Sequence, residues 1–431
     1  MGKDAAIIGL GKSGLAAKRL LELDGYAPID IYDDNRAIMG AHPIANYKDD
    51  YEITVVSPGV NPKQIKVPIS NRSSELELAY KYKKSNAKIL GVTGTNGKST
   101  VCHLTTQILN AMGKSAISVG NFGYPFADAV LDKPADYYVL ELSSFQIELL
   151  RKGQFSLDGL VFTNLTEDHL DRYGSYECYA NAKFGVFDFL AKDSMLAIPD
   201  NRKIKEMADA AGITNRLVVD ISSLYVYKGS DVKALNFGTF SLDLAKYRLV
   251  GLHNAENLAF SLVLIASVTS LVGDVTELIN VKELTGLPHR LELVRQRNEV
   301  SWINDSKSTT VESTSKAISS CHNSTLLLLG GKDKQLNYGE LAGDIEPSSV
   351  KLVIVFGEAR EAIAEHLKGG GLKKPLFVVN KLKDAVSLAA QKAQKGWNVL
   401  LSPACSSYDE FKNFEERGVR FAQYIDGLSA I

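Results

Sequence analysis

Short apolar runs alternate with stretches of helical spacing along most of the chain. Near the N-terminus the runs AAIIG, IDIYD and ITVVS (residues 5–9, 29–33 and 53–57) predict strands, and residues 12–23 predict a helix between the first two. Short apolar runs separated by amphipathic helices are typical of parallel strands joined by crossover helices. The pattern therefore predicts an α/β fold built on parallel sheets.

The alternation falls into three blocks. A polar segment rich in Lys and Tyr, YKYKKSNAK (residues 80–88), separates the first block from a second that contains KILGVT, DYYVLELS and DGLVFTNL. The second block ends near Gly-Leu-Pro at 286–288, and the third contains VSWIND, TLLLLGG, KLVIVFG, PLFVVN and NVLLSPA. A chain of 431 residues is also too long for one ordinary core. We predict three domains, over residues 1–86, 87–286 and 287–431.

Charge and cysteine content exclude several function classes. The chain has 49 Lys and Arg against 50 Asp and Glu, so binding of nucleic acid by bulk positive charge is not expected. The cysteines (Cys102, Cys178, Cys321 and Cys405) lie far apart, which argues against a zinc site or a disulfide scaffold and favours a reducing compartment.

Nothing in the hydropathy pattern indicates a membrane segment. The first residues lack the apolar core of a signal peptide, and the longest apolar stretch, residues 258–272, is too short for a membrane helix. We therefore expect a soluble, cytoplasmic protein without membrane insertion. Because no coiled coil or large exposed apolar helix is indicated, we expect a monomer.

A glycine motif follows the first predicted strand. Gly9, Gly11 and Gly14 form G-x-G-x-x-G between this strand and the next helix, and Asp33 ends the second strand about twenty residues later. Such glycines allow backbone N–H groups and a helix N-terminus to approach a diphosphate. The motif alone is equally compatible with a tight turn that binds nothing, and a diphosphate could belong to NAD, FAD or a nucleotide-sugar.

A second glycine-rich loop is more specific. GVTGTNGKST (residues 91–100) follows the strand KILGVT, and Lys98 and Ser99 open an amphipathic helix. In such loops backbone amides surround phosphates, the lysine reaches the β- and γ-phosphates, and the hydroxyl binds Mg²⁺. The spacing departs from the strict Walker A pattern, because the first glycine, Gly91, comes one residue early. We predict ATP binding here. Glu141, at the end of the strand DYYVLEL, would complete a Mg²⁺ site with Ser99, although from the residues alone a glutamate favoured by a helix dipole is a fair alternative.

The loop GxxGTNGKS resembles the phosphate loop of the Mur ligase and folylpolyglutamate synthetase superfamily, whose members form amide bonds with ATP. Further segments similar to the motifs of this superfamily follow in the same order: ELSSFQIE (141–148), NLTEDHLDRY (164–173), AKFGVF (182–187), GLHNAEN (251–257), LPHRLE (287–292), NDSKST (304–309) and SPACSSYDEFKNFEERG (402–418). The resemblance covers the whole chain. It implies an N-terminal Rossmann-like UDP-binding domain, a central P-loop ATPase-type mononucleotide-binding domain and a C-terminal Rossmann-like domain that binds the amino acid.

The resemblance also implies which residues meet ATP and metal. Asn254 and Asn257, expected just before an apolar helix, match positions near adenine, and Arg290 and Asp305 match phosphate and ribose contacts. The complete ATP-binding set is Gly94, Thr95, Asn96, Gly97, Lys98, Ser99, Thr100, Asn254, Asn257, Arg290 and Asp305. The residues implied to be catalytic are Lys98, His169, Lys183 and Lys307. Two Mg²⁺ ions are implied, one at Ser99 and Glu141, the other at His169 and at Lys183 carrying CO₂ as a carbamate.

Two further sets of residues follow from the same resemblance. The residues expected to bind UDP-N-acetylmuramoyl-L-alanine are Gly11, Ser13, Gly14, Asp33, Ser57, Pro58, Gly59 and Asn121. The residues expected to bind the amino acid are Thr309, Lys334, Ser407, Tyr408 and Phe414. Tyr408 stands where a small aliphatic residue is expected, and the segment GGKDK (330–334) is more basic than expected, so both bear on amino-acid specificity.

The motifs together are most similar to superfamily members that add D-glutamate to UDP-N-acetylmuramoyl-L-alanine in peptidoglycan synthesis. A sister ligase that adds another amino acid is the nearest alternative. A folylpolyglutamate synthetase is disfavoured, because its phosphate loop would lie near the N-terminus. An NAD-dependent oxidoreductase would leave the phosphate loop unexplained, and a non-catalytic nucleotide switch would bind ATP without releasing phosphate.

Overall fold

The structure is a computed structural model. The structure describes residues 3–35, 37–48, 50–61, 65, 71–219, 225–228, 231–237, 240–243, 252–269, 273–274, 284, 286–333 and 337–428. The chain divides into two compact units, residues 1–246 with 255–284 and residues 247–254 with 285–431. No helix in these ranges is both long and apolar enough to cross a lipid bilayer.

The first sheet of the larger unit is parallel and has the strand order β2-β1-β3-β4. Its strands are β1 (Lys3–Ile8), β2 (Tyr26–Tyr32), β3 (Ile53–Val56) and β4 (Arg72–Ser73), and α1 (Lys12–Leu23) connects the first two. β2 and β3 lie on opposite sides of β1, so the strand order reverses there. In open parallel sheets ligands bind at the carboxyl ends of the strands beside such a reversal. The glycine motif and the Ser57–Gly59 loop both lie at this point.

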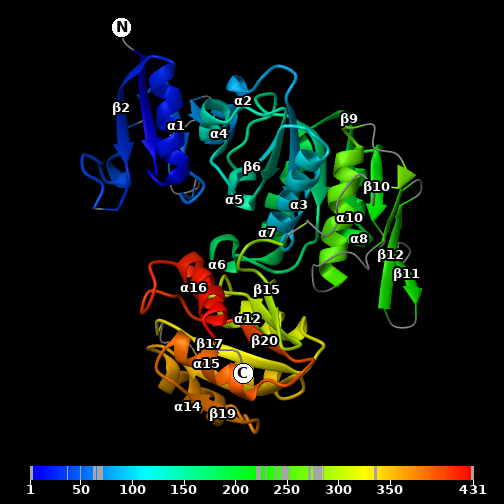
Figure 1. The fold of residues 1–431 in the computed structure, drawn as a ribbon. Helices are drawn as coiled ribbons and strands as arrows, with labels where there is room; N and C mark the ends of the chain where they lie inside the picture. The colour runs from blue at the N-terminus through cyan, green and yellow to red at the C-terminus, as the bar shows by residue number, and fades with distance from the viewer. Residues whose placement is uncertain are drawn as a thin grey trace. The chain divides into compact units, whose positions relative to one another are not determined.

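The second sheet is also parallel, with the order β10-β9-β8-β5-β7-β6. Figure 1 labels its strands β6, β9 and β10. The strands are β5 (Lys88–Thr93), β6 (Ala116–Gly120), β7 (Tyr137–Glu141), β8 (Leu157–Phe162), β9 (Leu190–Pro199) and β10 (Arg216–Val219). The helices are α3 (Lys98–Ala111), α4 (Phe126–Asp132), α5 (Ser144–Ile147), α6 (Leu170–Tyr173), α7 (Tyr176–Phe184), α8 (Arg202–Ala210) and α10 (Leu252–Ala266). β5 lies between β7 and β8, so the phosphate loop that follows β5 lies where the order reverses.

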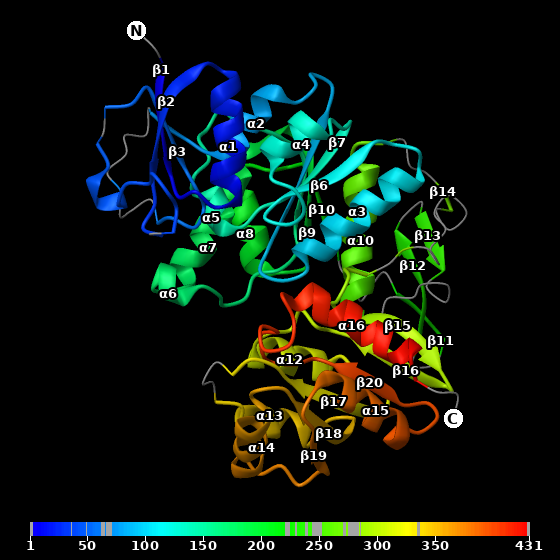
Figure 2. The same ribbon diagram turned by 60° about the vertical axis from the view of Figure 1, so that its left-hand side comes forward.

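Helix α2 (Glu75–Tyr82) links the two sheets of this unit. It packs against α1 and α4, as Figure 2 shows. Ser74 caps α2, since its hydroxyl accepts a hydrogen bond from the Glu77 N–H and the Glu77 carboxylate accepts one from the Ser74 N–H. This capping box fixes the entry of the chain into α2 immediately after the short strand β4.

A four-stranded sheet with the order β11-β12-β13-β14 was not anticipated from the α/β alternation. Its strands are β11 (Tyr225–Lys228), β12 (Asp231–Phe237), β13 (Phe240–Asp243) and β14 (Gly273–Asp274). The pairs β11–β12 and β12–β13 are antiparallel, so this part of the chain departs from the parallel pattern of its surroundings.

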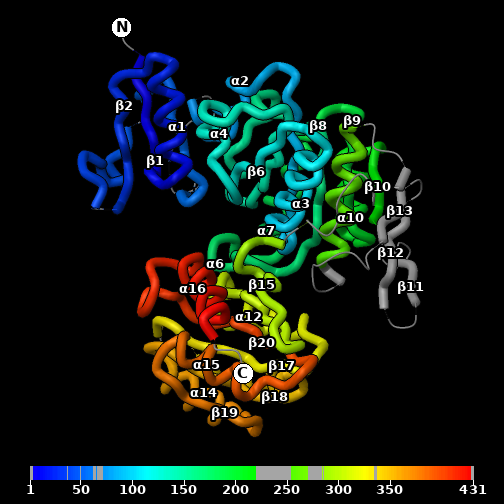
Figure 3. The backbone as a smooth tube through the Cα atoms, in the orientation of Figure 1, coloured from blue at the N-terminus to red at the C-terminus, as the bar shows by residue number. Residues whose placement is uncertain are grey.

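The smaller unit contains a six-stranded sheet, with the order β15-β16-β20-β17-β18-β19. Figure 3 traces the backbone of this unit from yellow to red. Its strands are β15 (Glu292–Arg297), β16 (Val300–Asn304), β17 (Thr325–Gly330), β18 (Val350–Phe356), β19 (Leu376–Val378) and β20 (Asn398–Leu401), and only β15 is antiparallel to its neighbour. Its helices are α12 (Val311–Ser319), α13 (Glu340–Ile345), α14 (Arg360–Gly369), α15 (Leu382–Lys392) and α16 (Phe414–Asp426).

Helices cover both faces of this sheet. In β17, Leu327 and Leu329 pack into a core with residues of α12, α13 and α14, whereas Leu326 and Leu328 pack with residues of α15 and α16. Because successive side chains in a strand point to opposite faces, a strand buried on both sides must be apolar throughout. The run TLLLLG meets this condition, and the predicted α/β fold with parallel sheets is confirmed.

Candidate functional site

The first glycine loop is closed by contacts that leave little room for side chains. Gly9 has φ +88°, and a Cβ at Gly14 would lie 2.2 Å from the Gly9 carbonyl oxygen. The Asp33 carboxylate accepts a hydrogen bond of 2.7 Å from the Leu10 N–H, and the Ser57 hydroxyl donates one of 2.5 Å to the Gly9 carbonyl. Asp33 and Ser57, both predicted from the sequence, therefore lie beside the glycine motif.

The glycine loop leaves open space at the N-terminus of α1. Gly11 is the N-cap of α1, and Ser13 lies in its first turn. A Cβ at Gly11 or at Gly59 would meet no atom within 4 Å. Backbone N–H groups at these two positions can therefore be approached closely by a ligand, which is the use the sequence predicted for them.

The phosphate loop connects β5 to α3 through two glycines in conformations that L side chains rarely adopt. Gly94 has φ +133°, and a Cβ there would lie 2.0 Å from the Thr163 hydroxyl. Gly97 has φ +86° and caps α3. The Lys98 ammonium donates hydrogen bonds to the carbonyl oxygens of Gly94 and Thr95, at 3.0 and 2.8 Å. The lysine is thus held across the loop, next to the N-terminus of the helix that Ser99 and Thr100 continue.

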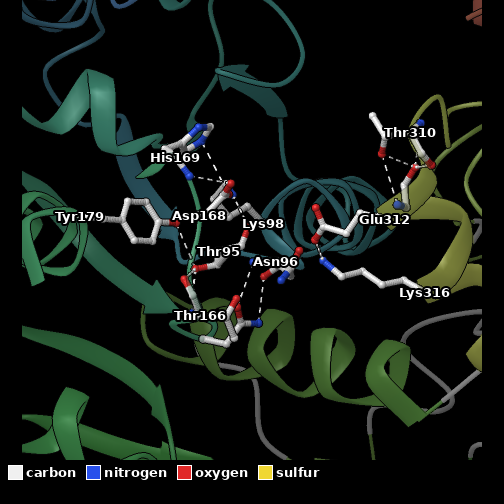
Figure 4. Close-up of polar contacts among 12 residues, drawn as sticks. Thr95, Asn96, Lys98, Thr166, Asp168, His169, Tyr179, Thr310, Glu312 and Lys316 are labelled. Atoms are coloured by element: carbon white, nitrogen blue, oxygen red, sulfur yellow. Dashed lines mark hydrogen bonds and ion pairs between the residues drawn. The ribbon is translucent and has the colours of Figure 1, made fainter. Parts of the chain in front are cut away.

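The loop is fastened from the segment after β8, a role that the sequence analysis missed. The Asn164 side chain accepts a hydrogen bond from the Asn96 N–H and donates one to the Asn96 carbonyl. The Thr95 hydroxyl lies between the Tyr179 hydroxyl, at 3.0 Å, and the Thr166 backbone, as Figure 4 shows. The available signal was the run of polar residues in NLTEDH directly after a buried strand.

Glu141 ends β7 with a carboxylate that is only partly satisfied. One oxygen accepts a hydrogen bond of 2.7 Å from the Asn121 side chain, whereas the other is buried and has no hydrogen-bond partner. Asn121, predicted for the sugar-linked substrate, therefore contacts a predicted metal ligand. An unpaired buried carboxylate oxygen costs free energy unless a cation compensates it. This oxygen fits a Mg²⁺ ligand, and the hard hydroxyl oxygen of Ser99 is chemically suited to the same ion.

Lys183 is buried, with 2% of its surface exposed, instead of lying on the surface of α7. Its ammonium donates a hydrogen bond of 2.7 Å to the Gly94 carbonyl. Burial, and then the nearby Lys98 charge, hold the pKa of Lys183 well below that of an ordinary lysine, with Asp168 and Glu141 acting in the opposite direction. An amine that is easily deprotonated fits CO₂ addition, because only the neutral amine can form a carbamate.

His169 lies in the left-handed region, with φ +52°, and forms the N-cap of α6. Its ring lies 4.7 Å from the Phe145 ring, between centroids, and its Nε2 lies 3.6 Å from the Asp168 carboxylate (Figure 4). The side chain of His169 is 43% exposed. The imidazole is therefore held by an aromatic neighbour and remains open to a ligand.

The two predicted adenine-side asparagines lie in α10. This helix begins at Leu252, so Asn254 lies inside its first turn and not before it. A Cβ at Gly97 would lie 2.5 Å from the Asn257 side-chain oxygen, which places Asn257 directly against the phosphate loop. Both asparagines are buried.

In the smaller unit, Asp305 is buried behind the loop that carries Lys307. Its carboxylate accepts hydrogen bonds from the Ser402 hydroxyl at 2.7 Å and from the Leu291 N–H at 3.2 Å. Burial raises the pKa of Asp305 to about 6, although these hydrogen bonds and the Arg290 charge oppose that shift. The Lys307 ammonium lies 5.9 Å from the centre of the Phe414 ring, so two residues predicted for different roles share one surface.

The predicted amino-acid residues differ in exposure. Ser407 is buried, whereas 69% of the Tyr408 surface is exposed. Thr309 lies in the loop before α12, where its N–H donates to the Lys307 carbonyl. Lys334 lies outside the described residues. The loops that carry Lys307 and Ser407 are joined by Arg417, whose buried guanidinium donates to the backbone carbonyls of Ser306, Cys405 and Ser406.

Two family models match the chain. The Mur ligase middle domain matches residues 92–265, and the Mur ligase glutamate ligase domain matches residues 289–405. The first match contains the phosphate loop from residue 92 onward, Glu141, His169, Lys183 and both asparagines. The second contains Arg290, Asp305 and Lys307.

Relatives of nearly equal length carry a common name. A UDP-N-acetylmuramoylalanine–D-glutamate ligase of Geotalea uraniireducens is 34% identical over 458 residues, covering 99% of this chain and 98% of that protein. The enzyme of the same name from Lactococcus lactis subsp. cremoris is 33% identical over 454 residues, covering 98% and 97%.

Solved structures with the same fold include other ligases. A UDP-N-acetylmuramate-alanine ligase from Thermotoga maritima has a TM-score of 0.56 at 17% identity, over 98% of this chain and 99% of that one. A MurF ligase from the same organism has a TM-score of 0.56 at 16% identity, over 99% and 96%. From the family models and the full-length relatives, the chain belongs to the Mur ligase family of ATP-dependent ligases that form amide bonds.

Proposed function

We propose that the protein joins D-glutamate to UDP-N-acetylmuramoyl-L-alanine, with conversion of ATP to ADP and phosphate, as a cytoplasmic step of peptidoglycan synthesis. The full-length similarity to ligases named for this reaction supports the choice of substrates. The observation that supports the chemistry is the meeting of Lys98 and Lys183 at the Gly94 carbonyl, inside a loop built to bind phosphate.

The proposed reaction has two steps. The carboxylate of the L-alanyl group attacks the γ-phosphorus of ATP, which forms an acyl phosphate and releases ADP. The amine of D-glutamate then attacks the acyl carbon, and the tetrahedral intermediate expels phosphate and loses a proton to give the amide. Both steps gather negative charge on phosphate oxygens, so positioned donors and cations contribute most of the catalysis.

Residues of the phosphate loop supply these donors. Backbone N–H groups from Gly97 to Thr100, at the N-terminus of α3, bind the β- and γ-phosphates, whereas the Thr95 and Asn96 N–H groups donate to Asn164 and shape the loop. Lys98 opposes the charge of the transferred phosphoryl group from its position across the loop. Asn254 and Asn257 bind on the adenine side of the nucleotide, and the rest of the set predicted from the sequence completes the ATP site.

Two Mg²⁺ ions fit the remaining ligands. Ser99 and Glu141 would hold one ion, and the Glu141 oxygen that lacks a hydrogen-bond partner supports this assignment. His169 and a carbamate on Lys183 would hold the second, which the low pKa of the buried Lys183 supports. When bound, the ions neutralise phosphate charge. Carbamate formation needs only CO₂, since the neutral amine adds to the carbon and one proton leaves.

The UDP-linked substrate is assigned to loops near the N-terminus, and D-glutamate to residues of the C-terminal part of the chain. The Gly11–Gly14 and Ser57–Gly59 loops bind the UDP group, and Asn121 lies toward the sugar. Thr309, Lys334, Ser407, Tyr408 and Phe414 bind D-glutamate, and Lys307 faces the acyl phosphate as a catalytic residue. A lysine opposite the side-chain carboxylate is the expected partner for an acidic substrate.

Product analysis tests this proposal directly. The protein is incubated with ATP, Mg²⁺, UDP-N-acetylmuramoyl-L-alanine and either D- or L-glutamate, and the products are separated and weighed by mass spectrometry. We expect a product with the mass of both substrates less one water, formed with D-glutamate only. Consumption of ATP without this product would reject the proposal.

A further inference from the structure

Arg172 connects two predicted parts of the substrate site that belong to different sheets. One guanidinium nitrogen donates a hydrogen bond of 3.2 Å to the Pro58 carbonyl, in the loop after β3. The other terminal nitrogen donates one of 3.0 Å to the Glu148 carboxylate, after α5. The side chains of Arg172 and Glu148 are only 11% and 19% exposed, so this is a shielded ion pair and not a surface contact.

The contact with Pro58 fixes the direction of a neighbouring donor. A trans peptide is planar, so the Pro58 carbonyl and the Gly59 N–H point to opposite sides of the same unit. By holding the carbonyl, Arg172 turns the Gly59 N–H away from itself. A Cβ at Gly59 would meet nothing within 4 Å, so there is open space beside this residue for a ligand.

The same arginine supports the His169 turn. Its guanidinium carbon lies 3.9 Å from the centre of the Phe145 ring, and the His169 imidazole also neighbours that ring, at 4.7 Å between centroids. Arg172 also lies in the turn that His169 caps, since its N–H donates to the His169 carbonyl at 3.1 Å. Cation–π contact with a shielded ring contributes more than the same contact in water.

We infer that Arg172 is a positioning residue for the UDP-linked substrate: it orients the Ser57–Gly59 loop toward the diphosphate and ties this loop to the His169 turn. The inference rests on the proposed function, because it takes the Ser57–Gly59 loop as the UDP site. It names a residue that acts through its neighbours and touches neither ATP nor the reacting atoms. Removal of the Arg172 side chain should therefore weaken binding of the UDP-linked substrate and leave binding of ATP unchanged.

Two substitutions separate the effect of the Arg172 charge from that of its planar set of hydrogen-bond donors. Arg172→Met keeps the length and removes the charge and all donors. Arg172→Lys keeps the charge, but a single ammonium cannot reproduce the planar fork that reaches Pro58 and Glu148 together. We expect Arg172→Met to raise the KM for UDP-N-acetylmuramoyl-L-alanine about 10- to 100-fold, while the KM for ATP stays within about twofold. For Arg172→Lys we expect a KM for the UDP-linked substrate between those of the wild type and Arg172→Met.

Arg151→Met is the matched control. Arg151 also bridges this unit, through Glu77 of α2 at 3.1 Å, but it pairs away from the Ser57–Gly59 loop. We expect it to lower the melting temperature and to leave the ratio of the two KM values unchanged. If Arg172→Met instead raises both KM values equally, or neither, the positioning role is overturned.

Calorimetric titration with UDP gives a readout that does not depend on ligase activity. We expect the wild-type protein to bind UDP, Arg172→Met to bind it at least about tenfold more weakly, and Arg151→Met to bind as the wild type does. Equal UDP affinity in all three proteins would overturn the inference. Wild-type protein that binds UDP but makes no D-glutamate product would reject the proposed function and leave the positioning role standing.

Discussion

Lys98 and Lys183 donate hydrogen bonds to the same acceptor, the carbonyl oxygen of Gly94, at 3.0 and 2.7 Å. Two ammonium groups at one carbonyl repel each other, and Lys183 is the more buried of the two. Lys183 is therefore the lysine whose charged form is disfavoured. Burial, and then the Lys98 charge, hold its pKa well below the ordinary value of a lysine. Conversion of Lys183 to an anionic carbamate would turn this repulsion into attraction.

Carbamylation of Lys183 is the first prediction. In ¹³C-bicarbonate the native protein should show a carbamate resonance that Lys183→Met abolishes and that Lys152→Met, at an exposed lysine, retains. Lys183→Met should also lower the rate of phosphate release at least about 100-fold, as is typical when a group that stabilises the transition state is lost. A resonance that persists in Lys183→Met would contradict the assignment.

Gly97 provides a test of the phosphate loop. In Gly97→Ala the new Cβ would be strained at φ +86° and would lie 2.5 Å from the Asn257 side-chain oxygen. We expect the KM for ATP to rise at least about tenfold, because the loop or the asparagine must move from its position. Gly113→Ala is the matched control, since Gly113 has φ +74° but open space around it. It should cost about 1–2 kcal/mol of stability and leave the KM for ATP unchanged.

Glu75 predicts a dependence of stability on pH. Its buried carboxylate accepts a hydrogen bond of 2.6 Å from the Ala127 N–H at the start of α4, and burial raises its pKa to about 7 from 4.5. A carboxyl whose pKa is raised in the folded state stabilises the fold fully below pH 4.5 and loses that contribution as pH rises through about 7. Glu75→Gln keeps an acceptor for Ala127 without ionising.

The free energy of unfolding, measured with urea at pH 5 and pH 8, should therefore change differently in the two proteins. Relative to Glu75→Gln, the wild type should lose up to about 3 kcal/mol between these pH values. Glu22→Gln, an exposed carboxylate on α1, is the control and should track the wild type. A wild type that gains stability over Glu75→Gln at pH 8 would show that the sign is wrong.

Arg417 predicts a large loss of stability from one substitution. Its guanidinium is fully buried and donates to the Ser306 hydroxyl and to carbonyls at Ser306, Cys405 and Ser406. Arg417→Met leaves these acceptors unpaired and should cost about 3 kcal/mol in urea unfolding. Arg420→Met, one turn later at an exposed arginine, should change stability by less than about 0.5 kcal/mol. Equal effects of the two substitutions would contradict the account.

The sequence predicted those features that depend on neighbouring residues. The helix predicted at residues 12–23 is α1 with the same bounds, and the strands before and after it follow from local apolar runs. The phosphate loop was found because strand, glycines, Lys98 and an amphipathic helix are contiguous. The hairpins of β11, β12 and β13 were missed although they too have a local signal. Gly-Ser and Gly-Thr between these strands favour hairpin turns, but the α/β pattern of the surrounding blocks obscured them.

Features that depend on distant pairing could not be predicted in the same way. Asn164 reaches the phosphate loop only because β8 pairs in parallel with β5, about 70 residues earlier. Glu75 and Arg417 stand among charged residues and look solvated in the sequence, yet the packing of α2 and α16 buries both. A role for Lys183 was predicted only from the family resemblance, and nothing in the sequence indicated its burial or its contact with the Gly94 carbonyl.

The most direct test of the central claim is the rate of phosphate release from ATP and Mg²⁺ with UDP-N-acetylmuramoyl-L-alanine and one amino acid at a time. We predict rapid release with D-glutamate, and none above background with L-glutamate, lysine or diaminopimelate, or when the UDP substrate is omitted. Equal release with lysine or diaminopimelate would contradict the assignment of the amino acid. Absence of release with D-glutamate would contradict the proposed reaction.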